Sequence, residues 1–85
     1  MTNEQIDKFL QQKRLDKVPV RISFKTRKSF VGVFITTNDY AELKSKNFWR
    51  IVGESESENY QKSKNLNLSR IYNGSEFTKL DVAVV

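Results

Sequence analysis

Residues 20–34, VRISFKTRKSFVGVF, decide the fold of this chain of 85 residues. Their first third alternates apolar and polar side chains, which is the two-residue period of a half-buried strand. From residue 30 to residue 35 the side chains are mostly β-branched or aromatic, and this predicts a second strand. The short, basic stretch at 25–29 then connects the two strands as an antiparallel hairpin.

Gly32 interrupts the second of these strands. A glycine inside a strand commonly marks a sharp bend or a close approach of two backbones. A small barrel needs such a point, because one strand must serve both halves of a strongly bent sheet. Pro19 supports the start of the first strand, since it blocks helix continuation and biases Val18 toward an extended conformation. We therefore expect a mainly antiparallel β fold from residue 18 onward.

An amphipathic helix is predicted before the strands. Thr2 and Gln5 have the spacing of a capping box, in which each side chain satisfies a backbone N–H that the helix leaves free. The apolar residues that follow have helical spacing: Ile6, Phe9 and Leu10. Three apolar anchors are too few for an isolated helix, so the predicted helix over 3–14 must lie against the rest of the domain.

Three further strands are expected in the second half of the chain. They cover residues 48–52, 66–72 and 77–80, and Asn73-Gly74 is a tight-turn signal before the last of them. Trp49 stands next to Arg50 in the first of these strands, and two interpretations are open. The pair is either a stacking platform with a cationic neighbour or, as is commoner for Trp in an alternating strand, a part of the core or an interface.

The connections between these strands are polar. Asp39 and Glu42 have the spacing of another capping box and predict a turn of helix that ends at Asn47, an interpretation we favour over a metal or acid–base pair. Residues 53–64 are too polar to bury and are predicted to form a mobile loop. Tyr60 lies in that loop, where it is either a ligand contact or, as we favour, solvated.

Composition excludes several kinds of chemistry. The chain has no Cys and no His, so disulfides, thiolate metal sites and thiol nucleophiles are absent, as is the commonest general base. No catalytic signature, cofactor motif or metal-ligand cluster is present, and we expect a protein that is not an enzyme. No apolar run approaches the roughly 18 residues of a membrane span, and no secretory segment is recognisable. The expectation is a cytoplasmic protein with no membrane partner.

The net charge of +5 is unevenly distributed. Residues 1–28 carry eight Lys or Arg against three acidic residues, whereas residues 29–85 carry seven of each. A concentrated positive field attracts polyanions through steering and counterion release, although it also keeps small proteins soluble. Within this basic third, Arg27 and Lys28 at the hairpin tip are the best-exposed candidates for phosphate contacts.

The order of these elements resembles the Sm-like (Lsm) family. The family's first motif has alternating apolar residues, a polar and basic turn, an aromatic residue and then a glycine, and residues 20–34 match it with Gly32 in place. Its second motif is matched by Tyr72, Gly74, Phe77 and Leu80. The resemblance implies one Sm-like domain over residues 1–85. The N-terminal helix would occupy 1–16, and a five-stranded, strongly bent antiparallel barrel of Sm-like or SH3-like type would occupy 18–85.

Proteins of this family assemble into rings by pairing the fourth strand of one subunit with the fifth strand of its neighbour, and many bind single-stranded RNA. The resemblance therefore implies a homo-oligomer, in which a closed circle removes both exposed edges. The family's RNA pocket lies after the second strand and in the turn before the fifth. By that correspondence Tyr40 would stack on a base, and Asn73 or Ser75 would meet base edges or phosphates.

Two positions depart from the family pattern: Glu42 stands near the place of an Asn, and Asn73 stands in the place of an Arg. We therefore expect a non-enzymatic oligomeric module that binds single-stranded nucleic acid, chiefly RNA. The predicted binding residues are Arg27, Lys28, Tyr40, Asn73 and Ser75. The alternative is a protein-interaction or self-assembly module that uses Trp49, Tyr72 and its strand edges and does not bind nucleic acid.

Overall fold

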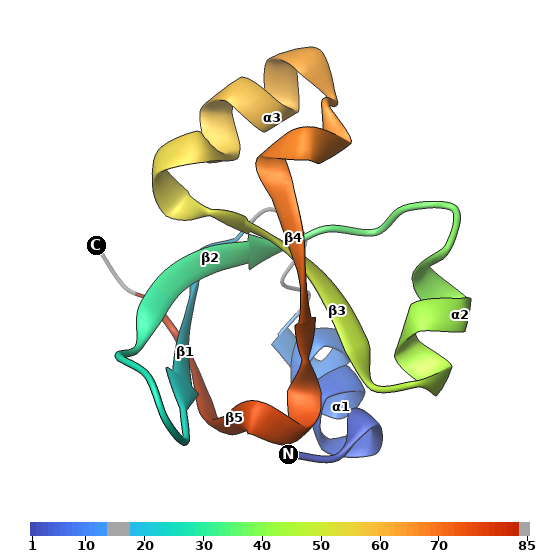
Figure 1. Ribbon diagram of the computed structural model, residues 1–85, viewed down its shortest axis with the longest axis vertical. Coiled ribbons are helices and arrows are strands. Elements are labelled where there is room, and N and C mark those ends of the chain that lie inside the picture. The colour runs from blue at the N-terminus through green and yellow to red at the C-terminus, as the bar shows by residue number, and fades with distance from the viewer. Residues whose placement is uncertain (14–17, 84–85) are drawn as a thin grey trace.

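The computed structural model describes residues 1–13 and 18–83. The elements follow one another in the order α1 (Asn3–Lys13), β1 (Val20–Phe24), β2 (Phe30–Phe34), α2 (Tyr40–Ser45), β3 (Phe48–Gly53), α3 (Ser57–Ser63), β4 (Ser69–Asn73) and β5 (Phe77–Val82) (Figure 1). Short 3₁₀ turns occupy Glu54–Glu56, Leu66–Leu68 and Gly74–Glu76. The predicted end of the first helix at residue 14, and the basic side chains of Lys13, Arg14 and Lys17, lie outside the described residues.

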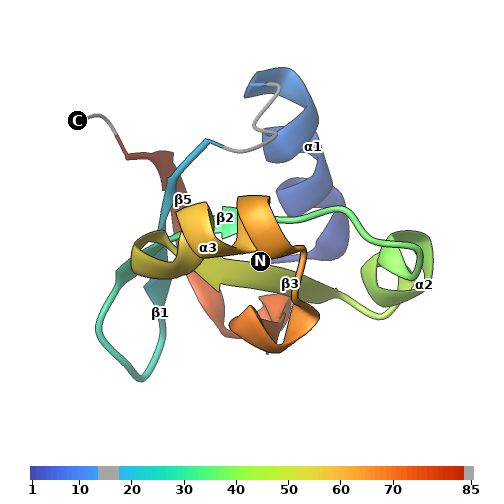
Figure 2. The same ribbon diagram turned by 90° about the horizontal axis from the view of Figure 1, so that it is seen from above.

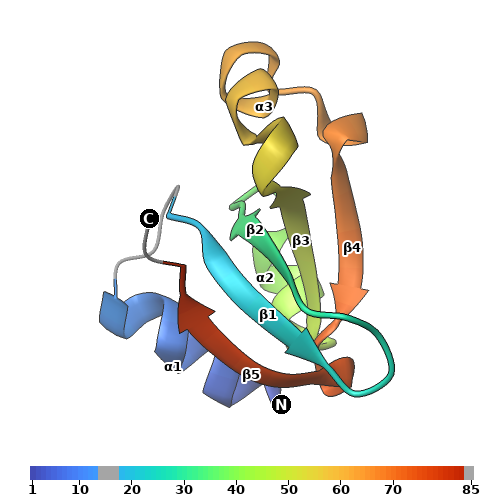
Figure 3. The same ribbon diagram turned by 90° about the vertical axis from the view of Figure 1, so that its left-hand side faces the viewer.

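The five strands form one antiparallel sheet in the order β4-β3-β2-β1-β5. The sheet is bent, and Figure 3 shows that β1 and β5 run at a steep angle to β3 and β4. The register between β1 and β5 shifts between Ser23 and Phe24, the kind of irregularity that accompanies bending. The predicted leading helix and five-stranded antiparallel sheet are confirmed. The sheet does not close into a barrel, and β4 and β5 remain its two edges.

Gly32 stands at a close approach of two strands, as its place in the sequence predicted. A Cβ atom built at this position would lie 2.7 Å from Cγ2 of Ile51 and 3.1 Å from the carbonyl oxygen of Val52. Both residues belong to β3, which pairs with β2. A side chain at residue 32 would therefore push β3 away from β2.

The leading helix is fixed by its cap and by its apolar face. The Thr2 hydroxyl accepts a hydrogen bond from the Gln5 N–H (3.2 Å), and the Gln5 side chain accepts one from the Thr2 N–H (3.0 Å), so the predicted capping box is confirmed. Ile6 is fully buried in the main core. Asp7 forms an ion pair with Lys44 of α2 (2.9 Å), which ties the two helices together.

Trp49 belongs to the core. Its side chain is 1% exposed, and its indole N–H donates to Oδ1 of Asn47 (2.8 Å). The interpretation of Trp49 as an open stacking platform is therefore wrong, and the commoner core interpretation is confirmed. Seven other buried residues complete this cluster: Ile6, Val20, Ile22, Phe34, Ile51, Phe77 and Leu80.

Residues 54–63 form a 3₁₀ turn and helix α3, so the prediction of a mobile loop over 53–64 is wrong. Tyr60 is the reason, because its side chain is 7% exposed and packs in a second core cluster with Ile35 and Val52. A single aromatic anchor produces no helical period in the sequence, but it suffices to hold this short helix against the end of the sheet (Figures 1 and 3).

Asp39 does not cap α2, although it stands at the capping position. Its carboxylate instead accepts hydrogen bonds from the Thr37 hydroxyl and from Nη2 of Arg50, the latter at 2.7 Å. The pKa of Asp39 lies below its usual value of 3.8. The hydrogen bond from Thr37 is the largest cause, and the hydrogen bond from the Arg50 guanidinium is the second. The predicted capping box at Asp39 and Glu42 is wrong because a cation from β3 reaches this carboxylate.

Among the described residues no helix is long and apolar enough to span a membrane.

Candidate nucleic-acid interface

A cavity of about 410 Å³ opens where the β1–β2 hairpin faces β4 and the turn before β5. We call it the hairpin cavity, and its lining includes Phe24, Arg27, Ile71, Tyr72, Asn73 and Glu76. The backbone holds the two sides together, because the N–H of Lys25 donates to the carbonyl oxygen of Glu76 (3.0 Å). Two of the predicted binding residues thus line one cavity: Arg27 from the β1–β2 hairpin and Asn73 from the end of β4.

The cavity is bordered by a cluster of aromatic rings. Phe24 and Phe30 stack in parallel with ring centroids 5.6 Å apart, and the Tyr72 ring lies 5.9 Å from Phe24 and 5.4 Å from Phe30. Phe77 meets Phe24 edge-on from the core side at 5.3 Å. Phe24, Phe30 and Tyr72 are only partly buried. Partly open aromatic faces are the surfaces on which unpaired bases stack.

Arg27 is held at this cluster by the ring of Phe24. Its guanidinium carbon lies 5.4 Å from the centroid of that ring, within the range of a cation–π interaction. A planar guanidinium in this position offers a stacking surface for a base and donors for a phosphate. Glu76 brings one negative charge to the lining, so the positive character of this surface depends also on the exposed Lys25 and Lys28 of the same hairpin.

Asn73 shapes the turn before β5. Its side-chain oxygen accepts a hydrogen bond from the Ser75 N–H (3.0 Å) and so caps the 3₁₀ turn. Among the described residues Nδ2 of Asn73 has no hydrogen-bond partner, and this exposed amide lines the hairpin cavity. An amide N–H at a cavity wall can donate to a base acceptor. Ser75 is exposed next to it but does not line the cavity.

The other two predicted residues lie elsewhere. Lys28 is exposed in the β1–β2 hairpin but is not part of the cavity lining. Tyr40 begins α2 and packs against Trp49 with the ring centroids 6.0 Å apart. Helix α2 and the β1–β2 hairpin lie on opposite sides of the molecule (Figures 1 and 2). The structure therefore brings Arg27 and Asn73 together and leaves Tyr40 apart from them.

Phe24, Phe30 and Glu76 were not predicted as site residues. The sequence did contain a signal for the two aromatic residues. Phe24 and Phe30 flank the basic connection at 25–29, and a hairpin places the side chains at such strand ends beside its exposed tip. The sequence patterns were interpreted only as strands. Glu76 has no such signal, since only the packing of the turn against β1 brings it to the cavity.

Comparisons of this chain with models of protein families, with curated proteins and with solved structures return no match. The features that bear on function are therefore the residues of the hairpin cavity and the two open edges of the sheet.

Proposed function

We propose that this protein is a non-enzymatic Sm-like module that binds single-stranded nucleic acid, chiefly RNA, at the hairpin cavity. One observation carries the proposal: Arg27 and Asn73 converge on a cavity bordered by partly open aromatic rings. Such a combination suits unpaired bases, because rings and guanidinium planes stack on any base while amide groups meet base edges.

Charge around the cavity supports the same ligand class. Lys25, Arg27 and Lys28 are all exposed on one hairpin, next to the aromatic cluster. When these residues bind phosphates, counterions are released from the nucleic acid. This release favours binding, and its contribution to the affinity falls as the salt concentration rises. The bases enter over Tyr72 and Phe24, and the backbone of the nucleic acid follows the hairpin.

We further propose that the protein acts in the cytoplasm as a homo-oligomer, with a ring as the preferred arrangement. The two edges of the sheet support it, since Ile71 on β4 is 49% exposed and Val82 on β5 is 36% exposed. Pairing β4 of one copy with β5 of the next satisfies both edges and covers these side chains. In this arrangement β4 and β5 pair between copies, so the predicted barrel would be completed by the neighbouring subunits and not within one chain.

A second function is favoured by the same edges. A module that only assembles, with itself or with another protein, would need Ile71, Val82 and the edge strands but no basic hairpin. It predicts an oligomer that is indifferent to nucleic acid. Light scattering on the free protein, followed by the binding experiment below, separates the two functions.

The binding experiment uses a fluorescein-labelled single-stranded oligouridine and fluorescence anisotropy. If about four phosphates are neutralised, the affinity should fall about fiftyfold between 50 and 200 mM salt. The double variant Arg27→Glu, Lys28→Glu should abolish binding at low salt. The control Lys62→Glu changes a cation on α3, far from the hairpin, and should retain most of the affinity (Figure 1). Absence of binding by the unmodified protein at low salt would contradict the proposal and favour the assembly module.

A further inference from the structure

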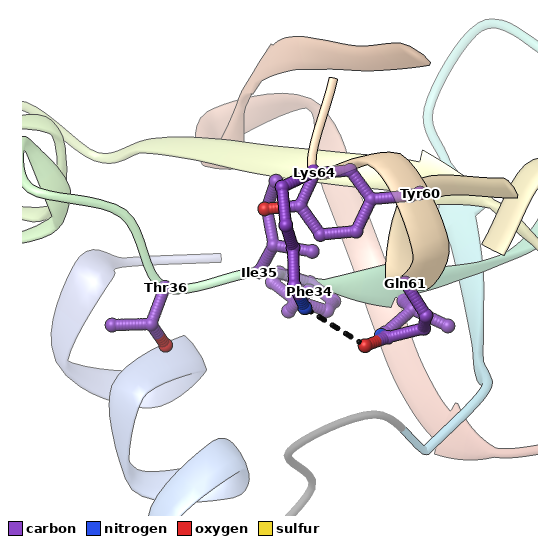
Figure 4. Close-up of a pocket in the computed structure, with 7 residues that line it drawn as sticks. Phe34, Ile35, Thr36, Tyr60, Gln61 and Lys64 are labelled. Atoms are coloured by element: carbon purple, nitrogen blue, oxygen red, sulfur yellow. Dashed lines mark hydrogen bonds between the residues drawn. The ribbon is translucent and has the colours of Figure 1, made fainter. Parts of the chain in front are cut away.

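A second cavity, of about 300 Å³, lies between α3 and the end of β2. We call it the α3 cavity, and six of its lining residues are labelled in Figure 4: Phe34, Ile35, Thr36, Tyr60, Gln61 and Lys64. It shares no lining residue with the hairpin cavity. The nucleic-acid function proposed above therefore leaves this cavity unassigned.

Part of the α3 cavity wall is apolar and firmly packed, and polar groups form the rest. Phe34, Ile35 and Tyr60 are each 7% exposed, and Val33 beside them is 2% exposed. The volume falls at the lower end of the roughly 300 to 1,000 Å³ that small-molecule sites occupy. A ligand that fits must be small and must present an apolar body to the rings and to Ile35.

Lys64 supplies the charge of this cavity. Its side chain runs across the Tyr60 ring, with Nζ 5.4 Å from the ring centroid, and donates to Oε1 of Gln61 (3.1 Å) (Figure 4). No carboxylate is among the residues that line the cavity, and no carboxylate of residues 1–13 or 18–83 forms an ion pair with Lys64. Lys62 differs, because it pairs with Glu58 on the same helix (3.3 Å).

The backbone at Lys64 is unusual for a lysine. Its φ of 56° is left-handed, at the C-cap position that closes α3, where the N–H of Lys64 donates to the carbonyl oxygen of Tyr60 (2.7 Å). Glycine is the residue that most often ends a helix in this conformation, since any side chain adds strain. A lysine here keeps an ammonium group over the cavity at the cost of that strain.

We propose that the α3 cavity binds a small monocarboxylic acid with an apolar body. The single ammonium of Lys64 balances a single negative charge, and Gln61 and Thr36 add hydrogen-bonding groups beside it. The apolar body lies against Ile35 and Tyr60. A phosphate fits poorly, because its greater charge would have one cation for compensation and the apolar side of the cavity would desolvate its oxygens.

Benzoate is a suitable probe, with benzamide as its neutral counterpart and inorganic phosphate as the second anion. Titration into ¹⁵N-labelled protein should shift the amide resonances of Ile35, Thr36, Gln61 and Lys64, with a dissociation constant on the order of 1 mM. Benzamide and phosphate should bind at least about tenfold more weakly. Equal binding of benzamide overturns the role of the carboxylate, and stronger binding of phosphate overturns the apolar ligand.

Three variants separate the ligand site from the stability of the helix. Lys64→Gly removes the ammonium and relieves the positive φ, so the urea midpoint should stay the same or rise while benzoate affinity falls about tenfold or more. Lys64→Met keeps the aliphatic stem and should lose the same affinity. The matched control Lys62→Met should bind benzoate as the unmodified protein does. Unchanged benzoate affinity in Lys64→Gly and Lys64→Met would overturn the proposal.

Discussion

Replacement of Gly74 by Ala tests how the turn before β5 is joined to the rest of the molecule. A Cβ atom at this position would lie 2.2 Å from Oδ1 of Asn47 and 2.6 Å from Cδ1 of Ile6. Neither atom moves freely. Oδ1 of Asn47 accepts the indole N–H of Trp49, Nδ2 donates to the carbonyl oxygen of Met1, and Ile6 is fully buried.

The cost has two parts. Overpacking against Ile6 costs about 1 to 3 kcal/mol. Displacement of Asn47 leaves the buried indole N–H of Trp49 without its acceptor, which costs about 1 to 3 kcal/mol more. Gly74→Ala should therefore lower the free energy of unfolding by about 2 to 6 kcal/mol, and in a domain of this size the Tm should fall by about 10 °C or more.

Gly53→Ala is the matched control, since a Cβ atom there meets nothing within 4 Å and the φ of −59° suits alanine. This variant should be unchanged or more stable by up to about 1 kcal/mol, because alanine restricts the unfolded chain. The stabilities of both variants are measured by urea unfolding, followed by Trp49 fluorescence, and by thermal unfolding, followed by circular dichroism. A Gly74→Ala protein as stable as the Gly53→Ala protein would refute the argument from the contacts of Asn47 and Ile6.

Two further predictions concern Asp39 and Tyr60. The lowered pKa of Asp39 means that its ionised form stabilises the fold above pH 3.8, and that this contribution is lost as the pH falls through the folded-state pKa. The difference in urea midpoint between the unmodified protein and Asp39→Asn should therefore shrink from pH 6 to pH 3; a constant difference would show that the bonds to Thr37 and Arg50 do not stabilise the charge. Tyr60→Ala should cost about 3 kcal/mol and should raise hydrogen exchange throughout α3, because that side chain is its buried anchor. Retained protection of α3 in this variant would show that the helix has another anchor.

Some elements were predictable because their signals are local. The hairpin over residues 20–34 follows from alternation and a basic turn, and the helix cap follows from the spacing of Thr2 and Gln5. Asp39 shows the limit of this reasoning, since its spacing to Glu42 fits a cap equally well. Arg50, on a strand that follows in sequence, reaches the carboxylate instead.

The candidate site was predictable only in part. Arg27 and Asn73 were identified as separate candidates, one from charge at a hairpin tip and one from the resemblance to a family turn. Their place on one cavity follows from the contact between Lys25 and Glu76, which joins the β1–β2 hairpin to the turn between β4 and β5. Local patterns cannot relate these two segments. The role of Tyr40 in base stacking stays a prediction. In the structure its ring packs on Trp49.

By itself, the sequence determined the leading helix and the number and direction of the strands, because alternation and capping act over a few neighbouring residues. The tertiary structure alone decided that the sheet stays open between β4 and β5, that Tyr60 turns a polar stretch into a helix, which glycines admit no side chain, and that the hairpin cavity and the α3 cavity form. These features depend on how far the sheet bends and on which distant side chains that bend brings into contact, and no short stretch of the chain contains that information.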